Sequence, residues 1–329
     1  MSGEHDLIAR IRRRVGSPPA WVSIGIGDDA AVIEPERGAQ IVITTDSLVE
    51  DVHFSRRLTP LDAVGEKALA VNLSDLAAMG ASPRACLLTL AVPDGVHSDE
   101  IDQLTGGLIE LASRAGAPLV GGNVTRSPGP LMVDVTALGS VRPRRVLRRS
   151  GGRAGDELFV TGQLGAAAAG LAALQSGEDR SRLDIDFSEC IRRYERPEAR
   201  LKCGIVVGRR QAATAAIDLS DGLADGVHHI AAESGLGAVI DAGDVPIHAG
   251  ASEWARRHGG DALGLALGGG EDYELLFAVS RRGKRNFLAA VRQSGDVMVT
   301  RIGRLRAEPG VWIDRDGRLE PLGTGFVHF

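Results

Sequence analysis

A charged, glycine-containing run near the middle of the chain, RPRRVLRRSGGRAGDE at residues 142–157, divides the hydrophobic pattern of the sequence into two halves. The run has no hydrophobic period, which is typical of a connection and not of a helix or a strand. Helix-like and strand-like patterns alternate before it, and the alternation restarts after it. At 329 residues, the chain is long enough for two cores. We therefore expect two mixed α/β domains, at residues 1–148 and 149–329.

Periodicity and flanking residues predict where the main elements lie. The strand-like stretches are residues 41–49, 86–92, 131–141, 157–162, 215–220 and 237–242. The helix-like stretches are residues 61–79, 98–115, 165–175 and 222–234, the second of them with Ser98 as its N-cap. We expect a connection of low order at residues 176–190, and short strands and turns at residues 299–329.

The composition excludes several classes of function. A net charge of −5 and an aromatic content of 4% argue against a nucleic-acid partner. The cysteines Cys86, Cys190 and Cys203 are odd in number and form no C-x-x-C, so neither a disulfide framework nor a thiolate metal site is expected. The N-terminal residues lack the apolar core of a signal peptide, and no apolar run approaches the roughly 18 residues of a membrane span. We expect a cytoplasmic protein with no membrane partner.

The stretch GIGDDAAVI at residues 25–33 begins like a dinucleotide-binding turn of the form G-x-G-x-x-G/A. However, Asp28 and Asp29 stand where a pyrophosphate would approach. The AVIEPERG that follows is too short and too turn-bounded for the helix that such a turn needs. The loop is therefore predicted to bind cations, which in turn bind phosphate.

Acidic residues recur at other turns and strand ends, namely Asp46, Asp75, Asp218, Asp221, Glu271 and Asp272. Like charges that are brought together are costly unless protons or cations neutralise them. Hard oxygen ligands suit Mg²⁺, which usually binds one or two carboxylates together with substrate phosphates. The pattern predicts a multi-metal phosphate site, in which Thr44 and Thr45 add hydroxyl oxygens beside Asp46.

Structural interpretations of these residues stay open. An aspartate in a turn often caps the backbone, and Asp75 is compatible with a solvated helix face. Ser220 or Asp221 would suit the N-cap of the following helix. The three glycines before Glu271 are also typical of a helix end and turn.

Two basic residues and several absent motifs complete the pattern. Arg149 fits either a phosphate clamp or a solvated hinge, and His53 alone is more typical of a satisfied, partly buried histidine. The sequence contains no G-x-x-x-x-G-K-[ST] and no protein-kinase signature set, so P-loop and protein-kinase chemistry are unsupported.

Several motifs occur in order along the chain, among them GIGDDAAVI, TTDSLVEDVHF, KALAVNLSDLAAMGASP, GG-x-x-TRS, IDLSDGLADG and GGEDYELLF. Together they resemble the thiamine-monophosphate kinase family, which belongs to a superfamily of ATP-binding enzymes that includes aminoimidazole ribonucleotide synthetase. The resemblance runs from about residue 4 to the terminal GFVHF. It implies ATP-dependent phosphorylation of thiamine monophosphate to thiamine diphosphate. It also implies a homodimer in which two N-terminal sheets pair into a barrel, and a C-terminal domain, a mixed sheet with helices, that completes the active site.

Carried over position by position, the resemblance assigns three sets of residues. Ligands of several Mg²⁺ ions are expected at Asp28, Asp29, Thr44, Thr45, Asp46, Asp75, Asn123, Asp218 and Asp221; Asp29 is better supported than Asp28, for which a role in holding the loop stays open. Nucleotide contacts are expected at Gly121, Gly122, Asn123, Arg149 and Ser220. Substrate contacts are expected at His53, Glu271 and Phe326. We expect Asp46, Asp221 and Arg149 to be the catalytic residues.

One position departs from the family pattern. Where the family usually reads GGDT, this chain reads Gly121-Gly122-Asn123-Val124. The amide of Asn123 still offers an oxygen to Mg²⁺ but brings no charge. We predict that this metal position is retained with weaker binding, or is met by water.

The expected mechanism is direct in-line phosphoryl transfer. The acceptor is a phosphate oxygen that is already ionised at neutral pH, so catalysis rests on positioning and charge neutralisation. Two alternatives are another ATP-dependent enzyme of the superfamily, and a nucleotide-binding homodimer with impaired catalysis, whose only support is Asn123.

Overall fold

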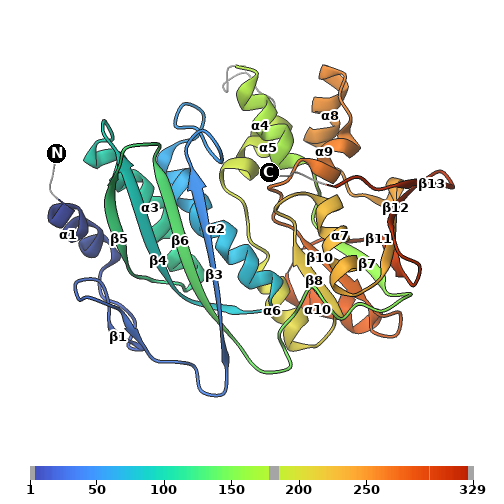
Figure 1. Cartoon of the computed structure of the whole chain (residues 1–329), viewed down its shortest axis with the longest axis horizontal. Helices are drawn as coiled ribbons and strands as arrows, with labels where there is room; N and C mark the ends of the chain where they lie inside the picture. Colours follow the sequence, from blue (N-terminus) through green and yellow to red (C-terminus); the bar gives the residue numbers. More distant parts are fainter. Residues whose placement is uncertain (1–3, 178–184, 296, 325–329) are drawn as a thin grey trace. The chain divides into compact units, whose positions relative to one another are not determined.

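A computed structural model describes residues 4–177, 185–295 and 297–324 of the chain (Figure 1). The chain divides into two compact units. Unit 1 comprises Met1–Leu76 and Ser82–Pro143, and unit 2 comprises Ala77–Ala81 and Arg144–Phe329. Apart from the short segment Ala77–Ala81, the chain passes from unit 1 to unit 2 between Pro143 and Arg144, inside the predicted connection at residues 142–157.

Unit 1 is built on a four-stranded sheet with the strand order β3-β6-β4-β5. The strands are β3 (Gln40–Val49), β4 (Ser82–Pro93), β5 (Leu119–Ser127) and β6 (Met132–Val141). β6 pairs antiparallel with β3 and with β4, whereas β5 joins β4 in parallel. A small antiparallel pair, β1 (Val22–Ile24) and β2 (Val32–Ile33), precedes this sheet. The predicted site residues on β3 and β5 thus lie on the two edge strands.

Two long helices, α2 (Leu61–Ala78) and α3 (Ser98–Ala115), cover one face of this sheet, and α1 (Glu4–Val15) packs against α3 (Figure 1). α2 and α3 approach each other at two glycines. A Cβ atom on Gly65 would overlap with the carbonyl of Leu104, and one on Gly107 would overlap with the carbonyl of Asp62. Only glycine lets the two backbones come this close. The crossing helps to seat α2, which carries Asp75.

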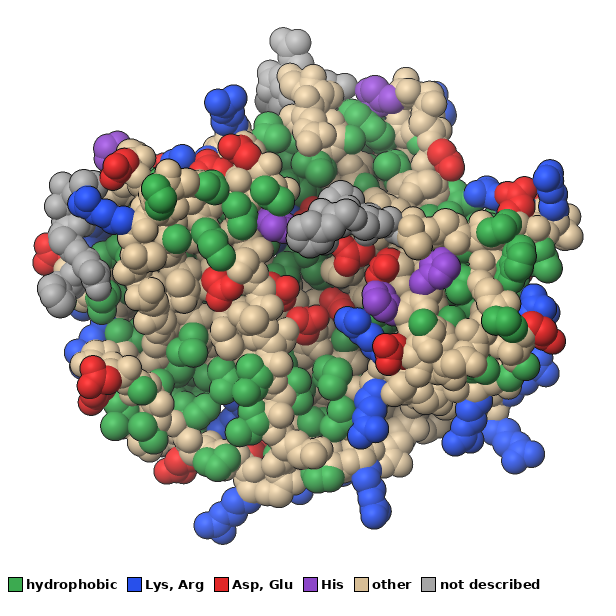
Figure 2. Space-filling view, viewed as in Figure 1, with side chains coloured by type: hydrophobic (Ala, Val, Ile, Leu, Met, Phe, Trp, Pro, Cys, Tyr) green, Lys and Arg blue, Asp and Glu red, His purple; other side chains and the backbone are tan. Residues whose placement is uncertain are grey.

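The opposite face of the sheet carries apolar side chains that remain exposed to solvent. Side chains alternate along a strand, so the buried Val133, Val135 and Ala137 of β6 face the helices. On β3, Ile41 and Ile43 are 59% and 64% exposed. Apolar side chains gather over this part of the molecule in Figure 2, which is seen from the same side as Figure 1. An exposed apolar sheet face is typical of a surface that another protein covers.

Unit 2 is built on a seven-stranded mixed sheet with the strand order β13-β12-β9-β11-β7-β10-β8. The strands are β7 (Glu157–Thr161), β8 (Ala215–Asp218), β9 (Gly237–Asp241), β10 (Leu275–Val279), β11 (Val299–Arg306), β12 (Val311–Arg315) and β13 (Arg318–Pro321). The pairing is antiparallel except between β12 and β9. β8, which ends at Asp218, is an edge strand.

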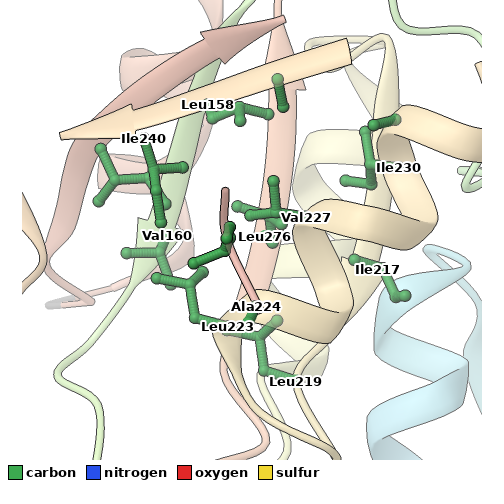
Figure 3. Packing of buried hydrophobic residues seen from close by; sticks show 14 of the residues in the cluster. Leu158, Val160, Ile217, Leu219, Leu223, Ala224, Val227, Ile230, Ile240 and Leu276 are labelled. Carbon is green, nitrogen blue, oxygen red and sulfur yellow. The ribbon is translucent and has the colours of Figure 1, made fainter. Parts of the chain in front are cut away.

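Helices pack on both faces of this sheet. They are α4 (Ala166–Gln175), α5 (Ile185–Glu195), α6 (Leu201–Arg209), α7 (Leu223–Glu233), α8 (Ala249–His258), α9 (Ala262–Gly268) and α10 (Lys284–Ser294), with a short 3₁₀ helix, η2 (Ala242–Asp244). Leu158 and Val160 of β7 pack with α7 on one side (Figure 3), whereas Phe159 packs with α6 and α10 on the other. The two faces of β7 thus serve two cores, which is why its three central residues, Leu158, Phe159 and Val160, are all apolar.

The expected elements are mostly present, with two corrections. Ser98 is the first helical residue of α3, and the N-cap is His97, whose amide donates to Glu100 Oε2 at 2.8 Å. Residues 185–190, expected to be of low order, belong to α5; residues 178–184 lie outside the described part of the chain. Among the described helices, none is both long and apolar enough to cross a membrane.

Candidate active site

A first group of predicted site residues lies on β3 and α2 of unit 1. Thr44 and Asp46 share a side of β3 with Leu48, which is 5% exposed. Thr44 Oγ1 donates a hydrogen bond to Asp75 Oδ2 on α2. Burial, followed by the charge and hydrogen bonding of Asp75 and the charge of Asp134, raises the pKa of Asp46 from 3.8 to about 6. Two carboxyl groups thus share a partly buried space, an arrangement that a cation would stabilise.

Thr45 points to the other face of the sheet, away from Thr44. Its Oγ1 lies 3.4 Å from Asp134 Oδ1 and 3.1 Å from Thr136 Oγ1. Ser47 Oγ donates to Asp134 Oδ2 at 2.5 Å. The two threonines that the resemblance assigns to one metal role therefore offer their side chains on opposite faces of β3.

Asp134 is a member of this group that the sequence predictions missed. The available signal was its place in β6, where it stands between the fully buried Val133 and Val135 and so faces the opposite side. Across the sheet, Thr89 of β4 pairs with Asp134 on one side and with Asn123 of β5 on the other. Two strand spacings separate Asp134 from Asn123, roughly 10 Å. That separation is too large for Asp134 to take the place of the missing carboxylate at the Asn123 position.

The donors in unit 1 suit Mg²⁺ in kind, because they are carboxylate and hydroxyl oxygens. They occur as pairs, Asp46 with Asp75 and Ser47 with Asp134. No group of three or more histidine, cysteine, aspartate or glutamate side chains within the described residues is arranged to hold a metal ion by itself. Mg²⁺ typically binds through one or two carboxylates and completes its shell with phosphate and water. The residues therefore fit an ion that arrives with a phosphorylated ligand better than a preformed all-protein cage.

Asp28 and Asp29 lie in the exposed loop between β1 and β2. Asp28 Oδ1 accepts the amide of Asp29 at 2.9 Å, a bond between neighbouring residues of the loop. The next element is the strand β2 and not a helix, which agrees with the rejection of a dinucleotide-binding turn. Gly27 has φ +120°, and a Cβ there would overlap with the guanidinium of Arg12 from α1.

The glycines of β5 make room for the neighbouring strand. Gly122 has φ +152°, and a Cβ on it would overlap with the carbonyl of Leu88. The parallel register between β4 and β5 shifts between Cys86 and Leu87, just before the glycines pair with β4. Asn123 follows with an exposed side chain on the edge strand. The glycines thus lie within a continuous strand, and their role as nucleotide contacts stays a prediction.

His53 lies in the turn after β3. Its Nδ1 accepts the amide of Val49 at 3.1 Å, and its own amide donates to the carbonyl of Val49 at 2.9 Å. The ring is thus fixed by local bonds, in line with the structural interpretation. In the neutral ring this bond places the proton on Nε2.

In unit 2, the motifs IDLSDGL and GGGEDYEL lie side by side. β8 and β10 pair up to Asp218 and Leu275, and backbone bonds continue beyond the strands. The amide of Glu271 donates to the carbonyl of Ser220 at 2.6 Å, and the amide of Tyr273 donates to the carbonyl of Leu219 at 3.0 Å. The predicted nucleotide contact Ser220 and the predicted substrate contact Glu271 are thus held next to each other.

The capping interpretation of Ser220 and Asp221 is wrong. The N-cap of α7 is Gly222, with φ +99°, and it makes no side-chain cap bond. Ser220 Oγ instead donates to Asp221 Oδ2 at 3.0 Å. The glycines before Glu271 do end a helix, since Gly269 is the C-cap of α9 and Gly270 has φ +68°.

The second motif contributes two buried carboxyl groups, those of Asp272 and Glu274. Asp272 accepts the amides of Gly165 at 2.7 Å and Ala167 at 3.3 Å, at the start of α4. Burial raises the pKa of Asp272 from 3.8 to about 7, against the effect of these two hydrogen bonds. Glu274, which is fully buried, accepts Thr161 Oγ1 at 2.6 Å and Arg200 Nε at 2.7 Å. Asp272 belongs to the acidic pattern noted in the sequence, but the sequence predicted no supporting role for it.

The two remaining predicted contacts are only partly placed. Arg149 is exposed and follows Arg148, whose carbonyl accepts the amide of Ala216 in β8 at 2.8 Å. This bond puts Arg149 beside the edge strand that ends at Asp218. Phe326 lies outside the described residues.

Comparison with known proteins identifies the family to which the chain belongs. Residues 27–141 match the AIR synthase related protein N-terminal domain, and residues 153–314 match the corresponding C-terminal domain. The thiamine-monophosphate kinase of Salmonella typhimurium is 41% identical over 331 residues, covering 99% of this chain and 98% of that protein.

Two solved structures support the same relationship. The crystal structure of thiamine-monophosphate kinase from Stenotrophomonas maltophilia K279a superposes with a TM-score of 0.84 at 40% identity, covering 95% of this chain and 96% of that one. AaThiL complexed with AMPPCP and TMP superposes with a TM-score of 0.79 at 31% identity, covering 99% and 97%. The protein has the two-domain fold of the AIR synthase related proteins, and it belongs to the thiamine-monophosphate kinase family.

Proposed function

We propose that the protein phosphorylates thiamine monophosphate to thiamine diphosphate with ATP as the phosphoryl donor. The observation that carries this proposal is the 41% identity, over nearly the full length of both chains, to a thiamine-monophosphate kinase. The 31% identical AaThiL, which binds AMPPCP and TMP, adds support for the two substrates. We keep residues 1–148 and 149–329 as the proposed functional division.

The residue roles follow the chemistry of each group. Asp46, Asp75 and the hydroxyl of Thr44 would hold Mg²⁺, with Asp28, Asp29, Thr45, Asn123, Asp218 and Asp221 as further proposed ligands of several ions. Gly121, Gly122, Asn123, Arg149 and Ser220 would contact the nucleotide, and His53, Glu271 and Phe326 the substrate. When bound, the cations supply positive charge that lets two phosphate groups approach each other.

The protein's own contribution is positioning. The acceptor is an ionised phosphate oxygen, so no residue needs to remove a proton from it. Arg149 offers a planar cation to phosphate oxygens, and the pairing of IDLSDGL with GGGEDYEL fixes Ser220 relative to Glu271. We propose direct in-line transfer, for which a chiral γ-phosphate should give inversion; net retention would instead indicate a phospho-enzyme.

The activity is tested by incubating the purified protein with thiamine monophosphate and Mg-ATP and measuring thiamine diphosphate. Wild type should form it, and Asp46→Ala and Asp221→Ala should each lower the rate by more than about tenfold. Asp94→Ala, in an exposed turn, is the matched control and should keep the rate. A folded wild type that binds ATP but forms no thiamine diphosphate would contradict the proposed activity. Full activity in both site variants would contradict the metal assignment alone.

We also propose that the protein is a homodimer in which the four-stranded sheets of two copies pair into a barrel. The support is the open, apolar face of the unit 1 sheet, where Ile41 and Ile43 are more than half exposed. Covering such a face removes apolar surface from water, at about 25 cal/mol per Å².

A further inference from the structure

The loop that carries Glu271 is held in a conformation that its sequence does not favour. Glu271 has φ +60° and Tyr273 has φ +49°, although neither is glycine. A non-glycine residue in the left-handed region costs on the order of 1 kcal/mol or more, and it persists only when surrounding contacts impose it. The contacts that impose it therefore decide where Glu271 lies.

Asp272 stands between these two residues and provides such a contact. Its side chain is 8% exposed and accepts the amides of Gly165 and Ala167. Both amides belong to the start of α4, where helix amides have no partner within the helix. The carboxylate therefore links the middle of the strained loop to the first turn of α4.

The backbone of the same loop is hydrogen-bonded to the turn that carries Ser220. The amides before and after Asp272, those of Glu271 and Tyr273, donate to the carbonyls of Ser220 and Leu219. A shift of Asp272 would therefore move Glu271 directly and would loosen its bond to Ser220. Glu274, the other buried carboxyl group, does not hold the strained loop in this way. Its backbone continues the regular pairing of β10, and its carbonyl accepts the amide of Leu219 at 2.9 Å.

We propose that Asp272 is a positioning residue that sets the place of Glu271 by anchoring the loop to the N-terminus of α4. The kinetic part of this inference rests on the proposed kinase function, in which Glu271 contacts the substrate; the structural part does not.

The structural part is tested by hydrogen exchange of the ligand-free protein. In Asp272→Asn, peptides that cover residues 270–275 and 165–168 should exchange about tenfold faster or more, because one charge-assisted bond is lost and an amide group faces a backbone N–H. Asp156→Asn is the matched control. Asp156 is 4% exposed and also accepts a backbone amide, that of Arg153 at 3.0 Å, and the hydroxyl of Thr214 at 2.6 Å. The control should change exchange around residues 150–156 and leave residues 270–275 unchanged.

The kinetic part is tested by the separate KM values for the two substrates. In Asp272→Asn, the KM for thiamine monophosphate should rise about tenfold, whereas the KM for ATP should change by less than about twofold. Equal changes in both KM values, or the same changes in Asp156→Asn, would mean general loosening and would overturn the positioning role.

The outcomes separate this inference from the proposed function. Wild type without kinase activity contradicts the function, while hydrogen exchange still decides the anchoring. An active enzyme whose Asp272→Asn variant matches wild type in exchange and in KM contradicts the inference alone. If Asp272→Asn does not fold, wild-type exchange decides. The amides of Gly165, Ala167, Glu271 and Tyr273 should open with one shared free energy, and fast exchange of Glu271 and Tyr273 beside protected Gly165 would overturn the anchoring.

Discussion

Asp46 and Asp75 lie close together in a partly buried space, so an ionised Asp46 lowers the stability of the folded protein at neutral pH. The folded-state pKa of Asp46 is about 6, above its usual 3.8. The folded state therefore holds the proton more tightly than the unfolded state. The stability that this proton contributes is fully present below about pH 4 and is lost as the pH rises through about 6. A site that pushes two carboxylates together in this way is less stable at neutral pH until a cation or a proton neutralises it.

Replacing Asp46 by asparagine should make the metal-free protein more stable at pH 7.5, by on the order of 2 kcal/mol, with little change at pH 4. Thermal unfolding at the two pH values measures this. Added Mg²⁺ should raise the melting temperature of wild type at pH 7.5 and raise that of Asp46→Asn less. Asp94→Asn should behave like wild type throughout. An Asp46→Asn variant that is equally destabilised at both pH values would show that Asp46 is a structural residue.

Asn123 allows a test of one metal position by restoring a charge. If the position holds a cation, Asn123→Asp should lower the Mg²⁺ concentration for half-maximal activity by several-fold, because ligand charge tightens cation binding. Thr125→Asp is the matched control, since it adds the same charge two residues further along β5 with an exposed side chain. Unchanged Mg²⁺ dependence in Asn123→Asp, or an equal change in Thr125→Asp, would show that the position does not bind the ion.

At the scale of single residues, the sequence indicates which side chains have metal-binding or phosphate-binding chemistry better than it indicates which side chains hold them in place. Asp218 was noticed in an acidic motif at a strand end, and Asp46 was noticed because Thr44 and Thr45 add hydroxyl oxygens beside it. The sequence did not predict a role for Asp134 or the proposed anchoring role of Asp272, because both roles depend on hydrogen-bond partners that are distant in sequence. Ser47 lies 87 residues from Asp134, and Gly165 lies 107 residues from Asp272.

At the scale of elements, the crossing of α2 and α3 depends on one glycine from each helix. Glycine lowers helix stability by about 1 kcal/mol relative to alanine, so an exchange to alanine usually helps. Gly107 should be the exception, because its Cβ would overlap with the backbone of Asp62. Gly107→Ala should destabilise unit 1 by about 1–3 kcal/mol, whereas the adjacent Gly106→Ala, which meets only the flexible end of Arg14 at 3.1 Å, should be neutral or stabilising. Urea unfolding of the two variants gives the comparison, and equal stabilities would mean that the helices move apart freely.

The predicted elements are distinguished by their apolar content, whereas the missed helix α5 is amphipathic and rich in charged residues. β3, α2 and α7 have long apolar stretches. α5 reads IDFSECIRRYE, with five charged residues among eleven, and its helix is held by contacts with α4 and α8. Tertiary packing, not local propensity, therefore decides that residues 185–195 are helical.

At the scale of the molecule, two α/β halves could be predicted, but their sheets could not. The seven-stranded order places β9 between β12 and β11, a neighbourhood that connects residues about 70 positions apart and that no local pattern encodes. The proposed dimer also depends on a feature that no local pattern encodes, namely which face of the unit 1 sheet is left exposed. The sequence predicts it only through the family resemblance, and the apolar face of β3 that supports it is recognised only once the covered face of the sheet is known.

The proposed dimer can be tested on that face without touching the site residues. Ile41 is 59% exposed at the far end of β3 from Asp46 and pairs with Ser140 of β6. Wild type should sediment at twice the chain mass of 34.5 kDa at micromolar concentration. Ile41→Asp should sediment as a monomer, because a buried charge without a partner costs several kcal/mol at an interface. Leu319→Asp is the control: Leu319 is 49% exposed on β13 of unit 2, and its exchange should leave the dimer intact. A monomeric wild type, or an Ile41→Asp variant that remains dimeric, would place the interface elsewhere or remove it.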